Sequence, residues 1–332
     1  KVAKVEAIRS KTFQEFADEF ITLRAATWKN PRHATQWPHT MRDYVYPVIG
    51  HLPPAEIKTQ HIKEILLPIW TTKTETATRV RGRIEMILDA AKVDGLRDGD
   101  NPARWRGHLE HSLPKPYLVH QEEHHAAMPW EQIGAFMAEL RARPALAARA
   151  LEFCILTATR TENTIGATWA EIDLDKKLWT IPAARMKGTK TEAREHRVPL
   201  SDRVIEILRE RQTEQGEPRP SDLIFPLSNM AMLTLLQKRM GRAVTVHGFR
   251  ATFRSWVSAR FRHSIELSKK ALAHKSGDKV DDAYQREELV EERRPLMEAW
   301  AQACASAPTG GTSAGSAKVV SIAGRPARAA QN

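Results

Sequence analysis

Residues 151–169 read LEFCILTATRTENTIGATW, and this stretch joins an apolar run to a short polar segment that contains Arg160. The region from Ala145 to Ala158 has only Arg149 and Glu152 as charged residues, so it predicts a buried helix with Cys154 in the core. An arginine that follows such a helix is in most proteins a surface residue or a cation at the helix C-terminus. The meaning of Arg160 therefore depends on the residues that come after it.

The composition bounds the class of protein. The chain has 332 residues, which is enough for two domains and tails. Lys and Arg outnumber Asp and Glu by 51 to 40, and the isoelectric point is near 9.7. This surplus indicates a polyanionic partner such as nucleic acid, although basic enzymes without one exist.

Two further properties of the sequence bear on location. No segment approaches the ~20 uninterrupted apolar residues of a membrane span, and the N-terminus has no signal peptide. The two cysteines, Cys154 and Cys304, lie far apart with no metal-type spacing, which fits a reduced, intracellular protein. We therefore expect an intracellular location and no membrane partner.

The first third of the chain has helical periodicity and predicts a helical domain over residues 12–111, after a linker at residues 1–11. Thr12 and Glu15 form a capping box, and Gly95 is expected to end the last long helix. A second helix is expected within residues 34–46, with Pro38 disturbing its first turn, and Thr59 is expected to cap a third. The predicted core stripes of the third and fourth helices are Ile62, Ile65, Leu66 and Ile69, and Val80, Ile84, Ile87, Leu88 and Ala91.

Residues 112–127 contain two prolines and no apolar period, so they predict an interdomain linker before a second domain over residues 128–305. A helix is expected from Pro129. Residues 178–200 change to β-branched and aromatic residues around a polar turn that contains glycine, which predicts a β-hairpin. Residues 306–332 are rich in Gly, Ser, Ala and Pro and predict a disordered tail. The expected fold class is mainly α, with a small β-sheet or hairpin in the second domain.

The second domain contains an inventory of side chains that suits phosphodiester chemistry without a metal. A strand cut of this kind needs an in-line nucleophile, positive charge on the phosphoryl oxygens and a proton for the leaving 5′-oxygen. Arginine binds phosphate through two donors, histidine and lysine supply protons, and tyrosine forms a covalent phosphoester. Taken singly, such residues are mostly structural or solvated, so the ordered set carries the prediction. In chain order the set is Arg160, Lys187, His247, Arg250, His274 and Tyr284.

Other patterns with chemical meaning are weaker. His108 and His111, and the run from Glu122 to His125, have metal-like composition but no further ligands nearby in sequence. Asp281 and Asp282 could mimic a two-metal carboxylate pair, but adjacent residues diverge on a helix. A Gly-rich phosphate loop is missing from the sequence. We therefore expect no bound metal, no cofactor and no use of ATP.

The segments around the six residues resemble those of the tyrosine recombinase, or phage-type integrase, family. LTATRT with GATWAEIDL is similar to the first-arginine box, RMK with EHRVPLS to the hairpin, VHGFRATFRSW to the His-x-x-Arg box, ALAHK to the Leu-(Ala/Gly)-His box, and DDAYQR to the nucleophile segment. The resemblance implies a mainly α, two-domain recombinase that integrates or excises a prophage or genomic island. It implies that Tyr284 attacks the scissile phosphate to form a 3′-phosphotyrosyl intermediate, that Lys187 is the general acid, and that Arg160, Arg250, His247 and His274 complete the site.

The resemblance extends from about residue 12 to residue 305, because YVYPVIGHLPPAEI and NPARWRGHL resemble the core-binding domain of prophage integrases. It implies double-stranded DNA attachment sites, a homotetramer on DNA and accessory DNA-bending proteins as partners. An N-terminal arm-binding domain, common in such integrases, is expected to precede this chain. The expected DNA contacts are Arg79, Arg81, Arg83, Arg106 and Lys190.

Three positions depart from the family pattern. Asn163 stands where a glutamate is usual, so a carboxylate that orients Arg160 is absent or displaced. Lys190 is a rival of Lys187 for the general-acid role, and Ser255 stands where an aspartate is common. Two alternatives stay open: a degenerate DNA-binding protein that does not recombine, and a relaxing enzyme like type IB topoisomerases, against which the helical N-terminal domain argues.

The last predicted helix poses a separate question. Leu289, Leu296, Met297 and Trp300 lie at partner-facing positions, so we expect this helix to dock on a neighbouring protomer. The alternative is that it packs in its own domain.

Overall fold

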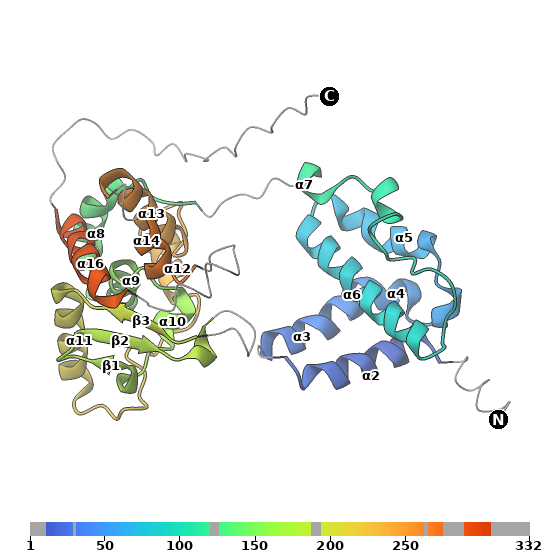
Figure 1. Cartoon of the computed structure of the whole chain (residues 1–332), viewed down its shortest axis with the longest axis horizontal. Helices are drawn as coiled ribbons and strands as arrows, with labels where there is room; N and C mark the ends of the chain where they lie inside the picture. Colours follow the sequence, from blue (N-terminus) through green and yellow to red (C-terminus); the bar gives the residue numbers. More distant parts are fainter. Residues whose placement is uncertain are drawn as a thin grey trace. The chain divides into compact units, whose positions relative to one another are not determined.

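The computed structural model describes residues 11–28, 31–119, 126–186, 194–261, 265–274 and 289–306 (Figure 1). The chain divides into two compact units, one on each side of the boundary between residues 122 and 123. Each unit has a separate hydrophobic core. No helix in the described ranges combines the length and the apolar character needed to cross a bilayer.

The N-terminal unit is built from helices. The α-helices are α2 (Phe13–Ala25), α3 (Pro31–Thr40), α4 (Tyr46–Ile49), α5 (Thr59–Trp70), α6 (Thr74–Val93) and α7 (Pro116–Val119), with a π-helical turn at Met41–Val45 and 3₁₀ turns at Pro54–Glu56 and Leu109–His111. The capping box is confirmed, because the Thr12 amide and the Glu15 side chain hydrogen-bond at 2.9 Å while the Thr12 hydroxyl accepts from the Glu15 amide. Gly95, with φ of +74°, ends α6 as predicted.

The core of this unit follows the predicted helical stripes. All nine stripe residues of α5 and α6 are buried, and they pack together with Phe13, Met41 and Trp70. This burial is the main favourable term that holds the helices together, at about 25 cal/mol per Å² of apolar surface.

Two expectations for this unit were wrong in detail. The second helix begins at Pro31 rather than near residue 34, and it includes Pro38. Because Pro38 has no amide donor, it weakens the helical ladder, and the chain continues as the π-helical turn at Met41–Val45. Thr59 is the first residue of α5, not its cap, and its hydroxyl instead contacts His108 Nε2 at 2.7 Å. The Lys58 amide donates to His61 Nδ1 at 3.2 Å in place of a threonine cap.

The C-terminal unit contains a small antiparallel sheet. Its strands are β1 (Ile172–Asp173), β2 (Leu178–Ile181) and β3 (His196–Pro199), in the order β1–β2–β3. The pairing of Leu178 with Pro199 and of Ile181 with His196 confirms the predicted hairpin, whereas β1 was not predicted. The helices are α8 (Ile133–Arg141), α9 (Leu146–Leu156), α10 (Thr161–Ile165), α11 (Asp202–Gln215), α12 (Ala231–Thr234), α13 (Gly248–Arg260), α14 (Ile265–Ala271) and α16 (Val290–Ala305).

Helix α9 is the central element of this unit. Nearly every residue from Ala148 to Leu156 is buried, including Cys154, as predicted. Phe153 packs against Trp179 of β2 and against Phe225, with ring centroids 5.2 Å apart in both pairs. A helix that is apolar on all sides is stable only when other elements surround it, so the sequence of α9 places it inside the unit.

The last helix, α16, packs within its own unit. Leu296, Met297 and Trp300 are buried, and Trp300 Nε1 donates to the Ile155 carbonyl at 2.9 Å. The expectation that this face docks on a neighbouring protomer is therefore wrong for these residues, because their apolar surface is already buried against α8 and α9. The alternative, packing in the same domain, is what the structure shows.

Candidate active site

The turn between α9 and α10 presents Arg160. After α9 ends at Leu156, a chain of buried hydroxyls closes the turn: Thr157 contacts Thr159 at 2.9 Å, and Thr159 contacts Thr164 of α10 at 3.2 Å. Between them Ala158 has φ of +52°, a left-handed conformation that costs a non-glycine residue about 1–2 kcal/mol. Arg160 is the residue that immediately precedes α10 and caps its N-terminus.

The guanidinium of Arg160 is available to a ligand. Its side chain is half-buried, and burial lowers its pKa from the ordinary value. Among the described residues, no hydrogen bond or ion pair engages this guanidinium. A partly desolvated arginine with no carboxylate on it is suited to an anion.

Arg250, on α13, lies beside Arg160 and is almost fully buried, with 5% of its surface exposed. Its Nη1 donates to the Ala158 carbonyl and its Nη2 to the Leu272 carbonyl, each at 2.5 Å. Burial and the nearby charge of Arg160 lower the pKa of Arg250 to about 10, so it stays protonated at neutral pH. Two neutral carbonyls thus fix the side chain without cancelling its charge.

His274 completes this group. It follows α14 and Ala273, which has φ of +46°, and its Nε2 lies 3.4 Å from Arg250 Nη2. Partial burial, together with the charges of Arg250 and Arg160, lowers the pKa of His274 to about 4. His274 is therefore neutral at physiological pH as long as no anion occupies the site.

Of the remaining predicted catalytic residues, one is described by the structure and the others are not. His247 caps α13 and is exposed, and its charge contributes to lowering the pKa of His274, which places it in the same neighbourhood. Lys187, Lys190 and Tyr284 lie outside the described residues. The structure thus brings Arg160, Arg250, His247 and His274 together, although they are up to 114 positions apart in sequence.

The four arginines predicted to bind DNA lie in three environments. Arg79 and Arg106 are exposed, and Arg79 pairs with Glu75 at 2.8 Å. Arg81 is mostly covered and donates to Glu85 and to the Ala103 carbonyl. Arg83 is buried, donates to the Gln36 carbonyl at 3.0 Å and lies over the Trp37 ring.

The position of Arg83 does not fit a contact with phosphate. It follows Val80 by three residues and precedes Ile87 by four, so helical geometry places it on the buried face of α6. Of the predicted contacts on α6, the one at Arg83 is contradicted by its burial, whereas the one at Arg79 stays a prediction.

Several contributors to the site were not predicted. The carbonyls of Ala158 and Leu272 hold Arg250, but every residue has a carbonyl, so no residue type could have indicated them. The hydroxyl chain of Thr157, Thr159 and Thr164 had a weak signal in the threonine-rich TATRTENT, which polar surface loops share.

The geometry defines an anion site. Two guanidiniums and a neutral imidazole converge, and within the described part of the chain neither guanidinium is hydrogen-bonded to a carboxylate. A phosphate placed here would relieve the repulsion between the arginines and receive charge-assisted hydrogen bonds.

Both units match phage integrases. Residues 13–108 match the phage integrase central domain, and residues 127–289 match the phage integrase family. This chain belongs to the phage integrase family. The predicted membership of the tyrosine site-specific recombinases is confirmed.

Relatives of similar sequence support this membership. The chain is 26% identical to the prophage integrase IntA of Escherichia coli K12, over 93% of this chain and 74% of the relative. It is 28% identical to the prophage integrase IntZ of the same strain, over 88% and 70%, and 26% identical to the integrase of Enterobacteria phage P4, over 91% and 71%.

Solved structures of integrases share the fold. A lambda integrase dimer bound to a COC′ core site superposes with a TM-score of 0.63 at 15% identity, covering 86% of this chain and 81% of that chain. The Tn1549 transposon integrase in complex with transposon right end DNA gives 0.61 at 15% identity, covering 88% and 100%. The predicted fold, mainly α with a small sheet, is confirmed.

Proposed function

We propose that this integrase cuts and rejoins DNA at attachment sites, and so integrates or excises a prophage or genomic island. The observation that carries the proposal is the convergence of Arg160, Arg250 and His274 with no carboxylate hydrogen-bonded to either arginine among the described residues. A scissile phosphate held there would receive charge-assisted interactions from both guanidiniums. Positive charge that is already in place stabilises the pentacoordinate transition state without a metal.

In the proposed reaction the phenol oxygen of Tyr284 attacks phosphorus and the bond to the 5′-oxygen breaks. Lys187, with Lys190 as its rival, donates a proton to the leaving oxygen. The phenol proton passes to a neutral imidazole, and His274 is neutral because of its low pKa. The 3′-phosphotyrosyl bond keeps the energy of the phosphodiester, so the 5′-hydroxyl of a second strand reverses the step without ATP.

One solved relative supports the proposed assembly. The lambda integrase has been solved as a tetramer bound to a Holliday junction, and that chain covers 84% of this one with a TM-score of 0.60. We propose a homotetramer on two DNA duplexes in the bacterial cytoplasm, with accessory bending proteins. Residues 12–111 would form the core-DNA-binding domain and residues 128–305 the catalytic domain, joined by the linker at 112–127.

Capture of covalent DNA adducts in cells tests the proposal. Wild type, Tyr284→Phe and Tyr117→Phe are expressed beside host and element DNA, the protein is isolated under denaturing conditions, and the attached DNA ends are sequenced. Tyr117 is an exposed tyrosine of α7, so its substitution is a matched control that should keep the adduct. Adducts at one discrete site, lost only in Tyr284→Phe, support the recombinase.

Other results point to the alternatives. Tyr284-dependent adducts scattered over the DNA favour a relaxing enzyme. Native DNA binding with no adduct in wild type favours the degenerate DNA-binding protein. An adduct that persists in Tyr284→Phe rules out the proposed nucleophile.

A further inference from the structure

Arg185 makes an unusual set of contacts near the proposed site. It lies in the 3₁₀ turn Ala183–Arg185 that follows β2. Its Nη1 donates to both carboxylate oxygens of Glu171, at 2.6 Å to Oε2, and its Nη2 donates to the Asn163 carbonyl and, at 3.5 Å, to the Glu162 carbonyl. One guanidinium therefore joins a carboxylate to the backbone of α10.

These contacts stabilise a helix that is too short to be stable alone. Helix α10 has five residues, and an isolated helix in water needs about 12–15. Its last carbonyls have no partner within the helix, and a cation at this end is favourable for both hydrogen bonding and the helix dipole. Arg185 fits closely here, since a Cβ on Gly166 would lie 3.0 Å from Arg185 Nη2.

Glu171 connects this arrangement to the sheet. Only 8% of its side chain is exposed, and it also accepts a 2.9 Å hydrogen bond from Trp179 Nε1 of β2. Asn163 is uncharged and cannot act as a carboxylate. Its buried side-chain amide contacts Met186 Sδ at 3.8 Å. A buried carboxylate, Glu171, thus contacts α10 indirectly, through Arg185.

We propose that Arg185 is a positioning residue for Arg160. The hydroxyls of Thr159 and Thr164 hold the N-terminal end of α10, and Arg185 holds the C-terminal end. Arg160 occupies the N-cap position of this helix without a side-chain capping bond, so fixing both ends of the helix would hold its backbone, and hence its guanidinium, near Arg250. The inference rests on the proposed function, because the task assigned to Arg160 is binding the scissile phosphate.

The test compares cleavage of two DNA substrates, one with a phosphodiester and one with a methylphosphonate at the scissile position. A methylphosphonate has a methyl group in place of one charged oxygen, so it needs less charge neutralisation from Arg160. Arg185→Ala should slow phosphodiester cleavage by roughly tenfold or more and methylphosphonate cleavage much less. Arg160→Ala serves as the reference, because it shows how much more the phosphodiester reaction slows than the methylphosphonate reaction when the guanidinium is absent. Arg185→Lys should recover part of the phosphodiester cleavage rate that Arg185→Ala loses. An ammonium can cap carbonyls but lacks the planar fork that also binds Glu171.

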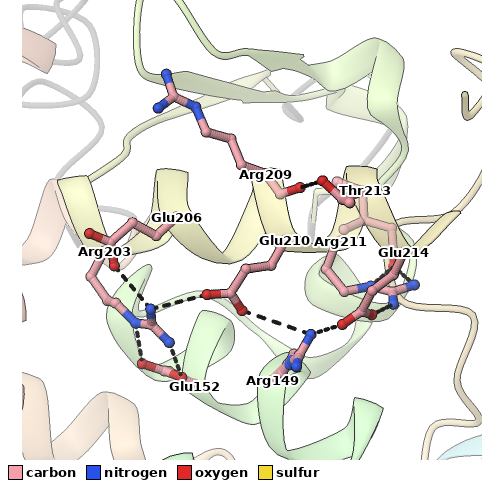
Figure 2. A network of polar contacts seen from close by, with 10 residues as sticks. Arg149, Glu152, Arg203, Glu206, Arg209, Glu210, Arg211, Thr213 and Glu214 are labelled. Carbon is pink, nitrogen blue, oxygen red and sulfur yellow. Dashed lines mark hydrogen bonds and ion pairs between the residues drawn. The ribbon is translucent and has the colours of Figure 1, made fainter. Parts of the chain in front are cut away.

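Arg203→Ala is the matched control. Arg203 also binds a buried carboxylate in the same unit, Glu152, at 3.0 Å, and it contacts Glu206 and Glu210 on its own helix (Figure 2). None of these partners belongs to α10. Arg203→Ala should lower the melting temperature yet keep the wild-type ratio of the two cleavage rates. Equal slowing of both substrates in Arg185→Ala, or no slowing, would overturn the proposal.

A second measurement keeps the proposal separate from the proposed function. The Nε–H resonance of Arg160, assigned by its absence in Arg160→Lys, reports on the order of the side chain with no DNA present. It should broaden or split in Arg185→Ala and stay sharp in Arg203→Ala. A sharp, unshifted resonance in Arg185→Ala would contradict the positioning role of Arg185, whether or not the chain cleaves DNA. Absence of Tyr284-dependent cleavage with a broadened resonance would instead count against the recombinase and keep the role of Arg185.

Discussion

Arg250 illustrates how this protein holds a charge away from water. Burying an arginine is costly unless its donors are satisfied, and here the carbonyls of Ala158 and Leu272 accept from both terminal nitrogens. The left-handed backbone at Ala158 and at Ala273 accompanies the turns that contain these carbonyls. The protein therefore accepts strain and a buried charge together, which is typical of a site arranged in advance for an anion.

The two arginines should differ when they are removed. Arg160→Ala removes charge from the transition state and should slow strand cleavage by on the order of 10²-fold, with little change in the melting temperature. Arg250→Ala should slow cleavage similarly and also destabilise the fold by about 1–3 kcal/mol, because two buried carbonyls lose their donor. Single-turnover cleavage and thermal unfolding measure the two effects. Near-normal cleavage in either variant would contradict its role.

His274 makes the free site sensitive to pH. Its pKa is about 4 in the folded chain and about 6.5 when unperturbed, so at pH 7 both the folded and the unfolded chain are neutral there. Between pH 6.5 and 4 the unfolded chain binds the proton more readily, so this residue should make the free energy of unfolding decrease as the pH falls. An NMR titration of the imidazole should give the low pKa in wild type and a higher one in Arg160→Gln. An ordinary pKa in wild type would show that the arginines do not act on this ring.

Among the helices, α16 is part of the core of its own unit and not an extension that docks on a neighbouring protomer. Trp300 is fully buried, its ring packs on Phe253 and Trp256, and its indole donates to α9. Position and polarity in the sequence are the same for a helix that docks in trans and one that packs in cis. Only the site of burial distinguishes them.

Removal of α16 should therefore unfold the C-terminal unit. A helix that served only for assembly could be removed without unfolding it. Trp300→Ala should cost about 3–5 kcal/mol of stability, and a stop after Pro295 should abolish the cooperative melt of the C-terminal unit. Gln302→Ala, an exposed change on the same helix, is the control and should leave the melt unchanged. Thermal unfolding followed by tryptophan fluorescence measures both. A truncated chain that still melts cooperatively would show that the packing of α16 is dispensable.

Over the whole molecule, the net charge of +11 leads us to expect DNA binding that weakens as the salt concentration rises. Each lysine or arginine that neutralises a phosphate contributes a slope of about −0.9 to the plot of log affinity against log salt concentration. Arg79→Ala and Arg106→Ala should each reduce the slope by about 1 if these exposed residues contact phosphate. Arg83→Ala should leave the slope unchanged and lower the stability, because Arg83 is buried.

Fluorescence anisotropy with duplex DNA over a series of salt concentrations measures the slopes. A reduced slope in Arg83→Ala with normal stability would restore that residue to the DNA contacts. An unchanged slope in both exposed variants would place the DNA elsewhere on this unit.

Sequence patterns alone were enough to predict the fold class, the capping of α2, the core stripes of α5 and α6, and the hairpin of β2 and β3. These features are local: helical and strand periodicity, caps and turn residues act within a few positions, so one sequence displays them. Family membership was also within reach, because catalytic side chains occur in fixed order inside recognisable segments. The interruption after Pro38 and the place of Thr59 outside the cap were missed because small shifts at helix ends depend on neighbouring contacts.

Packing of the folded chain establishes which charges lie inside and which groups hold them. It placed Arg83 and Arg250 in the interior, joined Glu171 to α10 through Arg185, and brought α16 onto its own core. These outcomes depend on backbone carbonyls and apolar surfaces that are distant in sequence, such as the Ala158 carbonyl, which lies 92 positions before Arg250. A carbonyl has no signature in a sequence, and an apolar face does not state which surface will cover it. The physical reason is that burial and hydrogen-bond satisfaction are properties of the assembled chain.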